Sequence, residues 1–83
     1  MKKVLLYPLT TEKAIKMIEI ENKIAFVVYR KATKAEIKNS IKENFGAAVQ
    51  NLNIQIRNNK KIAFIKLKPE TPAIDIATKL GMI

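Results

Sequence analysis

The clearest pattern of apolar and polar positions lies in residues 34–45. Apolar residues recur there every four positions, the spacing of one helical face, at Ile37, Ile41 and Phe45. Thr33 and Glu36 have the spacing of a capping box, in which each side chain accepts a hydrogen bond from the other residue's backbone N–H. Gly46 suits the left-handed position that often follows a helix. The pattern therefore predicts a helix over residues 34–45.

Two further segments have helical spacing. In residues 11–20, Thr11 can cap the start, and the apolar stripe consists of Ala14, Met17 and Ile18, with Ile15 beside it. Near the C-terminus, Thr71 can cap a last helix that begins with Pro72, and Gly81 can end it. The side of this last helix that we expect to be buried consists of Ile74, Ala77, Thr78 and Leu80.

Strand patterns occupy the segments between these helices. Residues 24–29 are apolar on both faces and rich in β-branched and aromatic residues, so this strand should be central or covered on both sides. Residues 49–57 alternate between apolar and polar after a break at Gln50. The Asn dipeptide at 58–59 suits a hairpin turn because Asn tolerates positive φ, and residues 61–68 form the returning strand.

The predicted elements occur in the order α-β-α-β-β-α, and an extended segment at residues 4–6 can add a short N-terminal edge strand. This order predicts an α+β fold, in which a small antiparallel β-sheet has flanking helices, mostly on one face. Eighty-three residues are enough for one small domain, so we expect residues 1–83 to form a single domain.

Composition excludes several classes of site. Cys and His are both absent, which removes disulfides, thiolate zinc sites and the usual imidazole general base. With Gly46 and Gly81 as its only glycines, the chain has no Gly-rich phosphate loop. Its apolar runs are far shorter than the roughly 20 residues of a membrane span, and residues 1–8 lack a signal cleavage site. We therefore expect a cytoplasmic protein that is not an enzyme, needs no cofactor or metal, and does not insert into membranes.

The chain is strongly basic. It has 16 Lys and Arg residues and 7 Asp and Glu residues, for a formal net charge of +9. Residues 1–31 carry +4 of this excess and residues 48–71 another +4, whereas residues 72–83 are neutral. A small basic domain with such an uneven charge typically binds a polyanion. The charge therefore favours nucleic acid as a partner, with a role in solubility alone as the alternative.

Two groups of polar residues are candidates for RNA contact. The polar side of residues 49–57 is rich in amides although Asn is a poor strand residue; it consists of Asn51, Asn53, Gln55 and Arg57. Amides supply donors and acceptors that suit ribose hydroxyls and unpaired bases. The second group is the basic hairpin tip, with Arg57, Asn58, Lys60 and Lys61. The alternatives are a strand face exposed to solvent and a charged tip that serves solubility.

Other basic and aromatic residues fit structural explanations better. Three lysines share one face of the predicted central helix, opposite its apolar stripe, and fit a solvated surface; they are Lys34, Lys38 and Lys42. The three phenylalanines lie in a core stripe or in apolar runs, so we expect Phe26, Phe45 and Phe64 in the core rather than stacked on RNA bases.

Four segments in register resemble the large-subunit ribosomal protein twenty-three family. They are Tyr7-Pro8-Leu9-Thr10-Thr11-Glu12-Lys13-Ala14, Ala32-Thr33-Lys34-Ala35-Glu36-Ile37-Lys38, Phe45-Gly46-Ala47-Ala48-Val49, and the hairpin with Asn53 and its return over residues 61–67. The resemblance covers nearly the whole chain. The short turn at residues 57–60 and the added C-terminal helix resemble archaeal members, and differ from the long basic loop that bacterial members place in the peptide tunnel.

The resemblance implies a structural constituent of the large ribosomal subunit, bound to rRNA near the polypeptide exit tunnel. The implied partners are large-subunit rRNA, neighbouring ribosomal proteins and nascent-chain factors such as the signal recognition particle. The residues expected to contact RNA are Lys2, Lys3, Thr11, Lys13, Asn51, Asn53, Gln55, Arg57, Asn58, Lys60, Lys61 and Lys66. Glu12 is expected to take part in factor docking, and its alternative role is to stabilise a helix N-terminus.

Two other functions also fit the residues. One is a free-standing basic nucleic-acid-binding module, which would not sediment with large subunits after a salt wash. The other is a protein-interaction module without RNA, whose binding would lack the salt dependence that released counterions produce.

Overall fold

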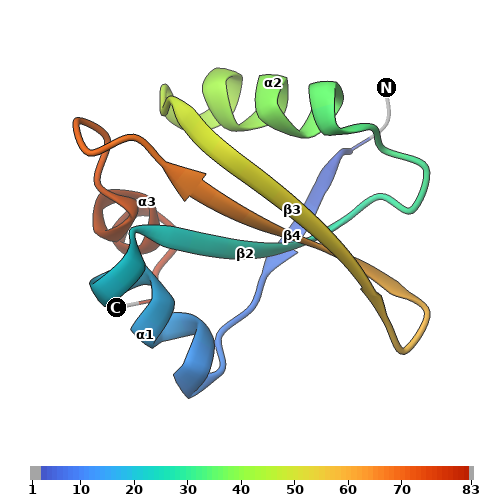
Figure 1. Ribbon diagram of the computed structural model, residues 1–83, viewed down its shortest axis with the longest axis horizontal. Coiled ribbons are helices and arrows are strands. Elements are labelled where there is room, and N and C mark those ends of the chain that lie inside the picture. The colour runs from blue at the N-terminus through green and yellow to red at the C-terminus, as the bar shows by residue number, and fades with distance from the viewer. Residues whose placement is uncertain (1–2, 83) are drawn as a thin grey trace.

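Residues 3–82, which the computed structural model describes, form four strands and three helices (Figure 1). The elements are β1 (Leu5–Pro8), α1 (Glu12–Glu21), β2 (Lys23–Val28), α2 (Lys34–Phe45), β3 (Val49–Arg57), β4 (Lys60–Leu67) and α3 (Ala73–Lys79). The predicted α+β class and element order are confirmed, and the N-terminal edge strand is present over residues 5–8 instead of 4–6.

The four strands form one antiparallel sheet in the order β1-β2-β4-β3. β2 lies between two neighbours and has buried residues on both faces, as its apolar pattern predicted. The β3–β4 hairpin turns at Asn58 and Asn59, which have φ of 49° and 63°. Near the other end of β3 the pairing register shifts between Val49 and Asn51, so the pattern break at Gln50 is a bulge.

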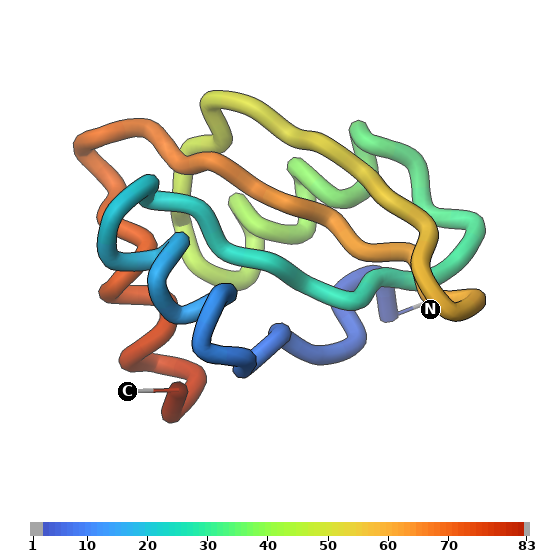
Figure 2. Tube along the Cα trace, turned by 60° about the horizontal axis from the view of Figure 1, so that its bottom comes forward, coloured from blue at the N-terminus to red at the C-terminus, as the bar shows by residue number. Residues whose placement is uncertain are grey.

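The main core lies between α2, α3 and one face of the sheet. Ile37 and Ile41 of α2 are fully buried and belong to the same cluster as Ile24 and Ile65 of the sheet. Burial of a side chain of this size stabilises the fold by about 1.5–3 kcal/mol. Figure 2 shows α2 passing behind the strands. This face of the sheet is therefore closed to ligands.

α1 also covers the opposite face of the sheet. Ala25, Val27 and Ile62 form a second buried cluster there, against which Met17 of α1 and Leu9 pack. The prediction that the helices mostly share one face holds for α2 and α3 but misses this role of α1. The reason is that β2 and β4 carry apolar side chains on both faces, so the second face also needs a cover.

The predicted caps of the first two helices are confirmed. The Thr11 hydroxyl accepts a hydrogen bond from the Ala14 N–H at 3.2 Å. Thr33 and Glu36 form both bonds of the capping box, at 3.2 and 2.9 Å. Gly46 ends α2 with φ of 65°, a conformation in which a side chain would be strained.

α3 departs from the prediction at its start and in its buried face. Thr71 does not cap the helix, because its hydroxyl donates toward backbone carbonyls while the Asn22 Oδ1 accepts from the Ala73 N–H at 2.6 Å. The buried residues are Ala73, Ile76 and Ala77, whereas Ile74, Thr78 and Leu80 are exposed. Because the cap comes from Asn22, outside the helix, local residue spacing cannot predict where the helix begins. The starting residue in turn decides which side chains face the core.

Candidate nucleic-acid interface

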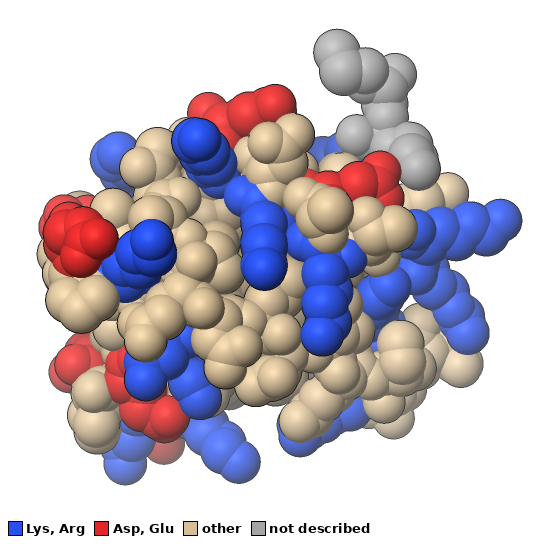
Figure 3. Space-filling view, turned by 45° about the horizontal axis from the view of Figure 1, so that its top comes forward, with Lys and Arg blue, Asp and Glu red and all other residues tan. Residues whose placement is uncertain are grey.

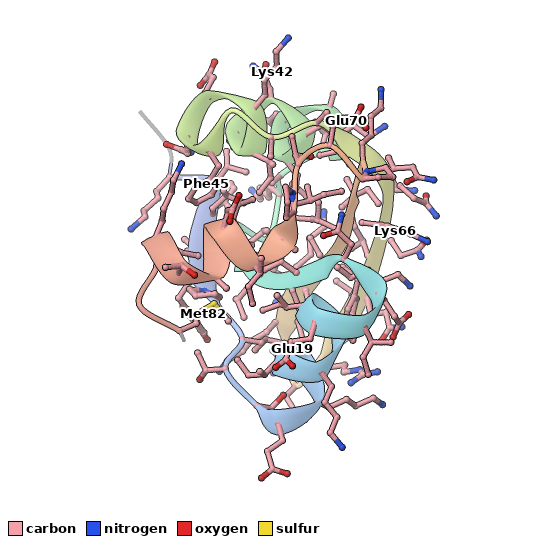
Figure 4. All side chains as sticks on the ribbon, turned by 90° about the vertical axis from the view of Figure 1, so that its left-hand side faces the viewer. Glu19, Lys42, Phe45, Lys66, Glu70 and Met82 are labelled. Carbon is pink, nitrogen blue, oxygen red and sulfur yellow. The ribbon has the colours of Figure 1, made fainter. Side chains whose placement is uncertain are left out.

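The sheet face opposite α2 and α3 carries polar side chains along β3 and β4, and we call this part the amide face. Its residues are Asn51, Asn53, Gln55 and Arg57 of β3 with Lys60, Phe64 and Lys66 of β4. The register pairs Asn51 with Lys66, Asn53 with Phe64, and Arg57 with Lys60. Residues directly opposite in an antiparallel pair share a face, so the alternation of both strands builds one surface. Figure 4 shows Lys66 projecting from the sheet on the side away from α3.

The amides on this face are available for binding. Asn53 and Gln55 are exposed, and no hydrogen bond within residues 3–82 engages their side chains. Asn51 differs, because its Oδ1 accepts a hydrogen bond from the Leu52 N–H at 2.9 Å. Its Nδ2 donors remain free within the described part of the chain. The face therefore offers uncharged donors and acceptors that the packing of the core does not require.

The start of α1 and the hairpin approach each other across the amide face. Thr11, Lys13, Arg57 and Phe64 line a hollow of about 80 Å³, together with Leu9, Ala14 and Met17. Thr11 and Lys13 are exposed, as is Arg57. The packing of α1 on the second cluster thus brings predicted site residues from opposite halves of the chain to one place.

Two cations on the amide face lie over aromatic rings. The Arg57 guanidinium carbon is 5.9 Å from the Phe64 ring centroid, and the Lys60 Nζ is 5.8 Å from that of Tyr7. Among residues 3–82, the one ion pair joins Lys23 and Glu21, so no carboxylate there pairs with Arg57 or Lys60. Both cations are exposed and remain free to meet a phosphate.

The three phenylalanines have different surroundings. Phe26 is buried at 3% exposure and lies 6.2 Å from the ring of Phe45, which is half-buried against the main core. Phe64 packs on the smaller second cluster and is also only half-buried. The core prediction is therefore confirmed for Phe26, whereas Phe45 and Phe64 meet it only in part, because each is half-buried against its cluster.

Several of the predicted site residues lie away from the amide face. Lys61 points to the opposite side of the hairpin, where its Nζ donates to the Ala32 carbonyl oxygen at 2.6 Å. Lys3 lines a separate hollow between β1 and α2. Asn58 is exposed in the turn, and Lys2 lies outside the described residues. The structure thus brings together most, but not all, of the predicted set.

Glu12 lies on the outer side of α1. It is exposed in the first turn of the helix and lines a shallow hollow with Ile15, Lys16 and Glu19, away from the hollow beside Arg57. Its position is compatible with both proposed roles, stabilisation of the helix N-terminus and factor docking. A carboxylate there is stabilised by the helix dipole and can still contact a partner.

Sequence reasoning missed Phe64 and Tyr7 as members of this surface. The apolar residues of β4 occupy both faces, so alternation alone could not tell which face Phe64 joins. The signal that resolves this is the pairing register, which sets Phe64 opposite Asn53. Tyr7 lies opposite Val27 and reaches the same face through a bulge in β1.

Basic side chains are also prominent on other parts of the surface. In Figure 3 they project from both ends of the molecule and across the middle of the visible face, with acidic groups among them. Lys34, Lys38 and Lys42 are exposed on α2. None of the three belongs to the amide face, so their positions agree with a helix face exposed to solvent.

Comparison with known proteins identifies the family. The family model described as ribosomal protein L23 matches residues 3–76. The chain belongs to this family. A large ribosomal subunit protein uL23 from Methanothermobacter thermautotrophicus is 42% identical over 80 residues, which cover 95% of this chain and 93% of that protein. Proteins of the same name from Methanococcus aeolicus and Methanococcus maripaludis are 46% and 47% identical over 76 residues, covering 90% of this chain and 88% of each.

Membership of the ribosomal protein L23 family confirms the resemblance of the four segments, including its archaeal character, because these relatives come from methanogens. The family consists of structural, non-enzymatic components of the ribosome. No helix within residues 3–82 has the length and apolar character needed to cross a bilayer.

Proposed function

We propose that this protein is a structural constituent of the large ribosomal subunit that binds large-subunit rRNA through the amide face and the cations around it. The observation that carries the proposal is a set of amides and cations on one sheet face that have no hydrogen-bond or ion-pair partner within residues 3–82, in a chain of a ribosomal family. Its place of action would be the cytoplasm, on the large subunit near the polypeptide exit, with neighbouring ribosomal proteins as further partners. Residues 1–83 would act as one rRNA-binding domain.

The chemistry divides between charge and hydrogen bonding. Lys13, Arg57, Lys60 and Lys66 neutralise phosphates, and the counterions that they release supply much of the affinity. Asn53 and Gln55 add hydrogen bonds to ribose hydroxyls and base edges, which duplex DNA does not present in the same way. The mixture therefore suits folded RNA better than a purely electrostatic surface would.

Sedimentation tests the ribosomal part of the proposal. A tagged form of the protein, expressed in a methanogen, should sediment with large ribosomal subunits after a high-salt wash, and crosslinking should recover large-subunit rRNA. Release by the wash, or recovery of mixed nucleic acids, would instead indicate a free-standing nucleic-acid-binding module. Sedimentation with subunits but without rRNA crosslinks would indicate attachment through other proteins.

We further propose that the outer side of α1 is a docking surface for nascent-chain factors such as the signal recognition particle. Glu12 is exposed there and faces away from the amide face, so rRNA bound to that face leaves it open. Ile20, at 79% exposure, adds an apolar group to the same helix. Ribosomes that carry Glu12→Lys should sediment normally and bind purified signal recognition particle more weakly. Unchanged factor binding by such ribosomes would contradict this role.

A further inference from the structure

The amide face holds an aromatic ring beneath a cation. The Arg57 guanidinium carbon lies 5.9 Å from the Phe64 ring centroid, and Asn53 is directly opposite Phe64 in the strand register. A surface that binds only phosphate needs the cation and has no use for the ring. The combination of a ring, a guanidinium and a free amide therefore points to a different ligand group.

Packing explains only part of Phe64. Its ring contacts the second cluster, formed by Ala25, Val27 and Ile62, and this contact requires an apolar side chain but not an aromatic one. The rest of the ring is open on the side of the amide face, because Phe64 is only half-buried. Arg57 has no carboxylate partner within residues 3–82 that would hold its guanidinium in place for structural reasons.

We propose that Arg57 and Phe64 form a stacking subsite for one unpaired base of the bound RNA. Aromatic rings and guanidinium planes are the two kinds of side-chain surface on which unstacked RNA bases lie. Asn53 supplies a donor and an acceptor for the edge or the ribose of that nucleotide. The subsite rests on the proposed function and adds to it, because it says where a base, rather than the phosphate backbone, is held.

The neighbouring residues complete a nucleotide-sized arrangement. Thr11 and Lys13 line the same hollow as Arg57 and Phe64, so a hydroxyl and an ammonium group lie beside the stacked base. The hollow, at about 80 Å³, is too small to enclose a base, which therefore lies over the ring and the guanidinium. The Lys13 ammonium is then available for the adjoining phosphate.

Binding measurements on two RNA probes test the subsite. The first probe is an archaeal large-subunit rRNA transcript, and the second is an RNA duplex without unpaired bases. Phe64→Leu and Arg57→Lys should each weaken binding to the rRNA by about 5- to 50-fold, within the range measured for loss of base stacking, and should leave duplex binding unchanged. The matched controls, Phe45→Leu at the edge of the main core and Arg30→Lys in the exposed turn before α2, should alter neither.

Fluorescence reports on the stacking directly. The chain contains no Trp, so Phe64→Trp introduces a single indole at the subsite. Its emission should be quenched by the rRNA and not by the duplex. A single indole at exposed Ile74 of α3, made by Ile74→Trp, should be unaffected by either probe.

The outcomes separate the subsite from the function on which it rests. Unchanged rRNA affinity in both Phe64→Leu and Arg57→Lys, with the wild-type protein still binding, would overturn the subsite and leave rRNA binding standing. Failure of the wild-type protein to bind the rRNA would overturn both. Should Phe64→Leu prove unfolded in its melting curve, Arg57→Lys decides alone, because Arg57 is exposed and its replacement removes no core contact.

Discussion

Asn53 lies at a strand position that disfavours it, and no hydrogen bond within residues 3–82 engages its side chain. We therefore expect Asn53→Ala to change the free energy of unfolding by no more than about 0.5 kcal/mol, as for other exposed positions. The same change should weaken rRNA binding by about 1–3 kcal/mol, because it leaves a buried partner group on the RNA unpaired. Melting curves and binding titrations on the same preparation check both values.

Asn39→Ala provides a matched control for this measurement. Asn39 is an exposed amide on α2, outside the amide face, and its loss should affect neither quantity appreciably. If Asn53→Ala unfolds the protein while its folded fraction binds normally, Asn53 is a structural residue and not part of the interface.

Asn22 is the opposite kind of asparagine, with every polar atom of its side chain occupied. Its Nδ2 donates to the Leu67 carbonyl at 3.0 Å, and its Oδ1 accepts from the Ala73 N–H at 2.6 Å. Its backbone is also left-handed, with φ of 56°. Asn22→Ala should therefore destabilise the fold by about 2–4 kcal/mol through lost hydrogen bonds and backbone strain, measured as the shift in a urea unfolding curve.

Asn22→Gly separates these two causes. Glycine accepts the left-handed conformation freely, so this variant retains only the hydrogen-bond loss and should be destabilised less than Asn22→Ala. Equal stability of Asn22→Gly and the wild type would show that the side-chain hydrogen bonds contribute nothing.

At the scale of elements, the β3–β4 hairpin and α2 offer two competing basic surfaces. Replacing Lys60 and Lys61 together by Ala removes the same charge as replacing Lys38 and Lys42, so the comparison reports position and not net charge. We expect replacement of the hairpin pair to weaken rRNA binding more than replacement of the α2 pair. It should also reduce the magnitude of the salt slope by about 1. Most of this effect should come from Lys60, which belongs to the amide face, whereas Lys61 donates to Ala32 on the other side.

The single variants sharpen this comparison. Lys61→Ala should chiefly reduce stability, by about 1 kcal/mol for its lost hydrogen bond, and Lys60→Ala should chiefly reduce binding. A larger binding loss from the α2 pair than from the hairpin pair would mean that rRNA approaches the α2 side, and the amide face would then not be the interface.

Elements with local signals were predictable from the sequence. α2 has its apolar stripe, its capping box and its terminal glycine within 14 consecutive residues, from Thr33 to Gly46, and its predicted bounds match the structure. The hairpin turn is likewise encoded by two adjacent Asn residues. The start of α3 could not be predicted in this way, because its cap comes from Asn22, 51 residues earlier in the chain. The packing of α1 on the second face of the sheet also depends on residues of other elements, so the sequence of α1 alone could not predict it.

At the scale of the whole molecule, the salt dependence of binding is set by how many of the 16 Lys and Arg residues contact phosphate. If about four to six basic residues contact phosphate, the logarithm of the association constant should fall with the logarithm of salt concentration at a slope of about −3 to −5. Titrations with the archaeal large-subunit rRNA transcript at several salt concentrations measure this slope. A slope near zero would remove the electrostatic part of the mechanism and favour a protein-interaction module.

The candidate site was predictable to the extent that it follows from strand alternation and charge. Asn53, Gln55 and Arg57 share a face because residues two apart in a strand must. That Thr11 and Lys13 lie beside Arg57 required the tertiary packing of α1. Lys60 and Lys61 lie on opposite faces because neighbouring strand residues alternate. Which of the two joins the amide face depends on the strand register, which pairs Lys60 with Arg57.

The position of β3 at the edge of the sheet affects the protein before it meets any partner. This nine-residue strand leaves one row of backbone groups unpaired by other strands, and Ile56 beside the turn is 59% exposed. Such an edge can pair with the same strand of a second chain. The positive charges of two chains repel each other, but salt screens this repulsion beyond about 8 Å at physiological ionic strength. The newly made protein should therefore be colloidally stable in dilute buffer and self-associate as salt rises, so its cation excess also protects it during the interval between synthesis and assembly.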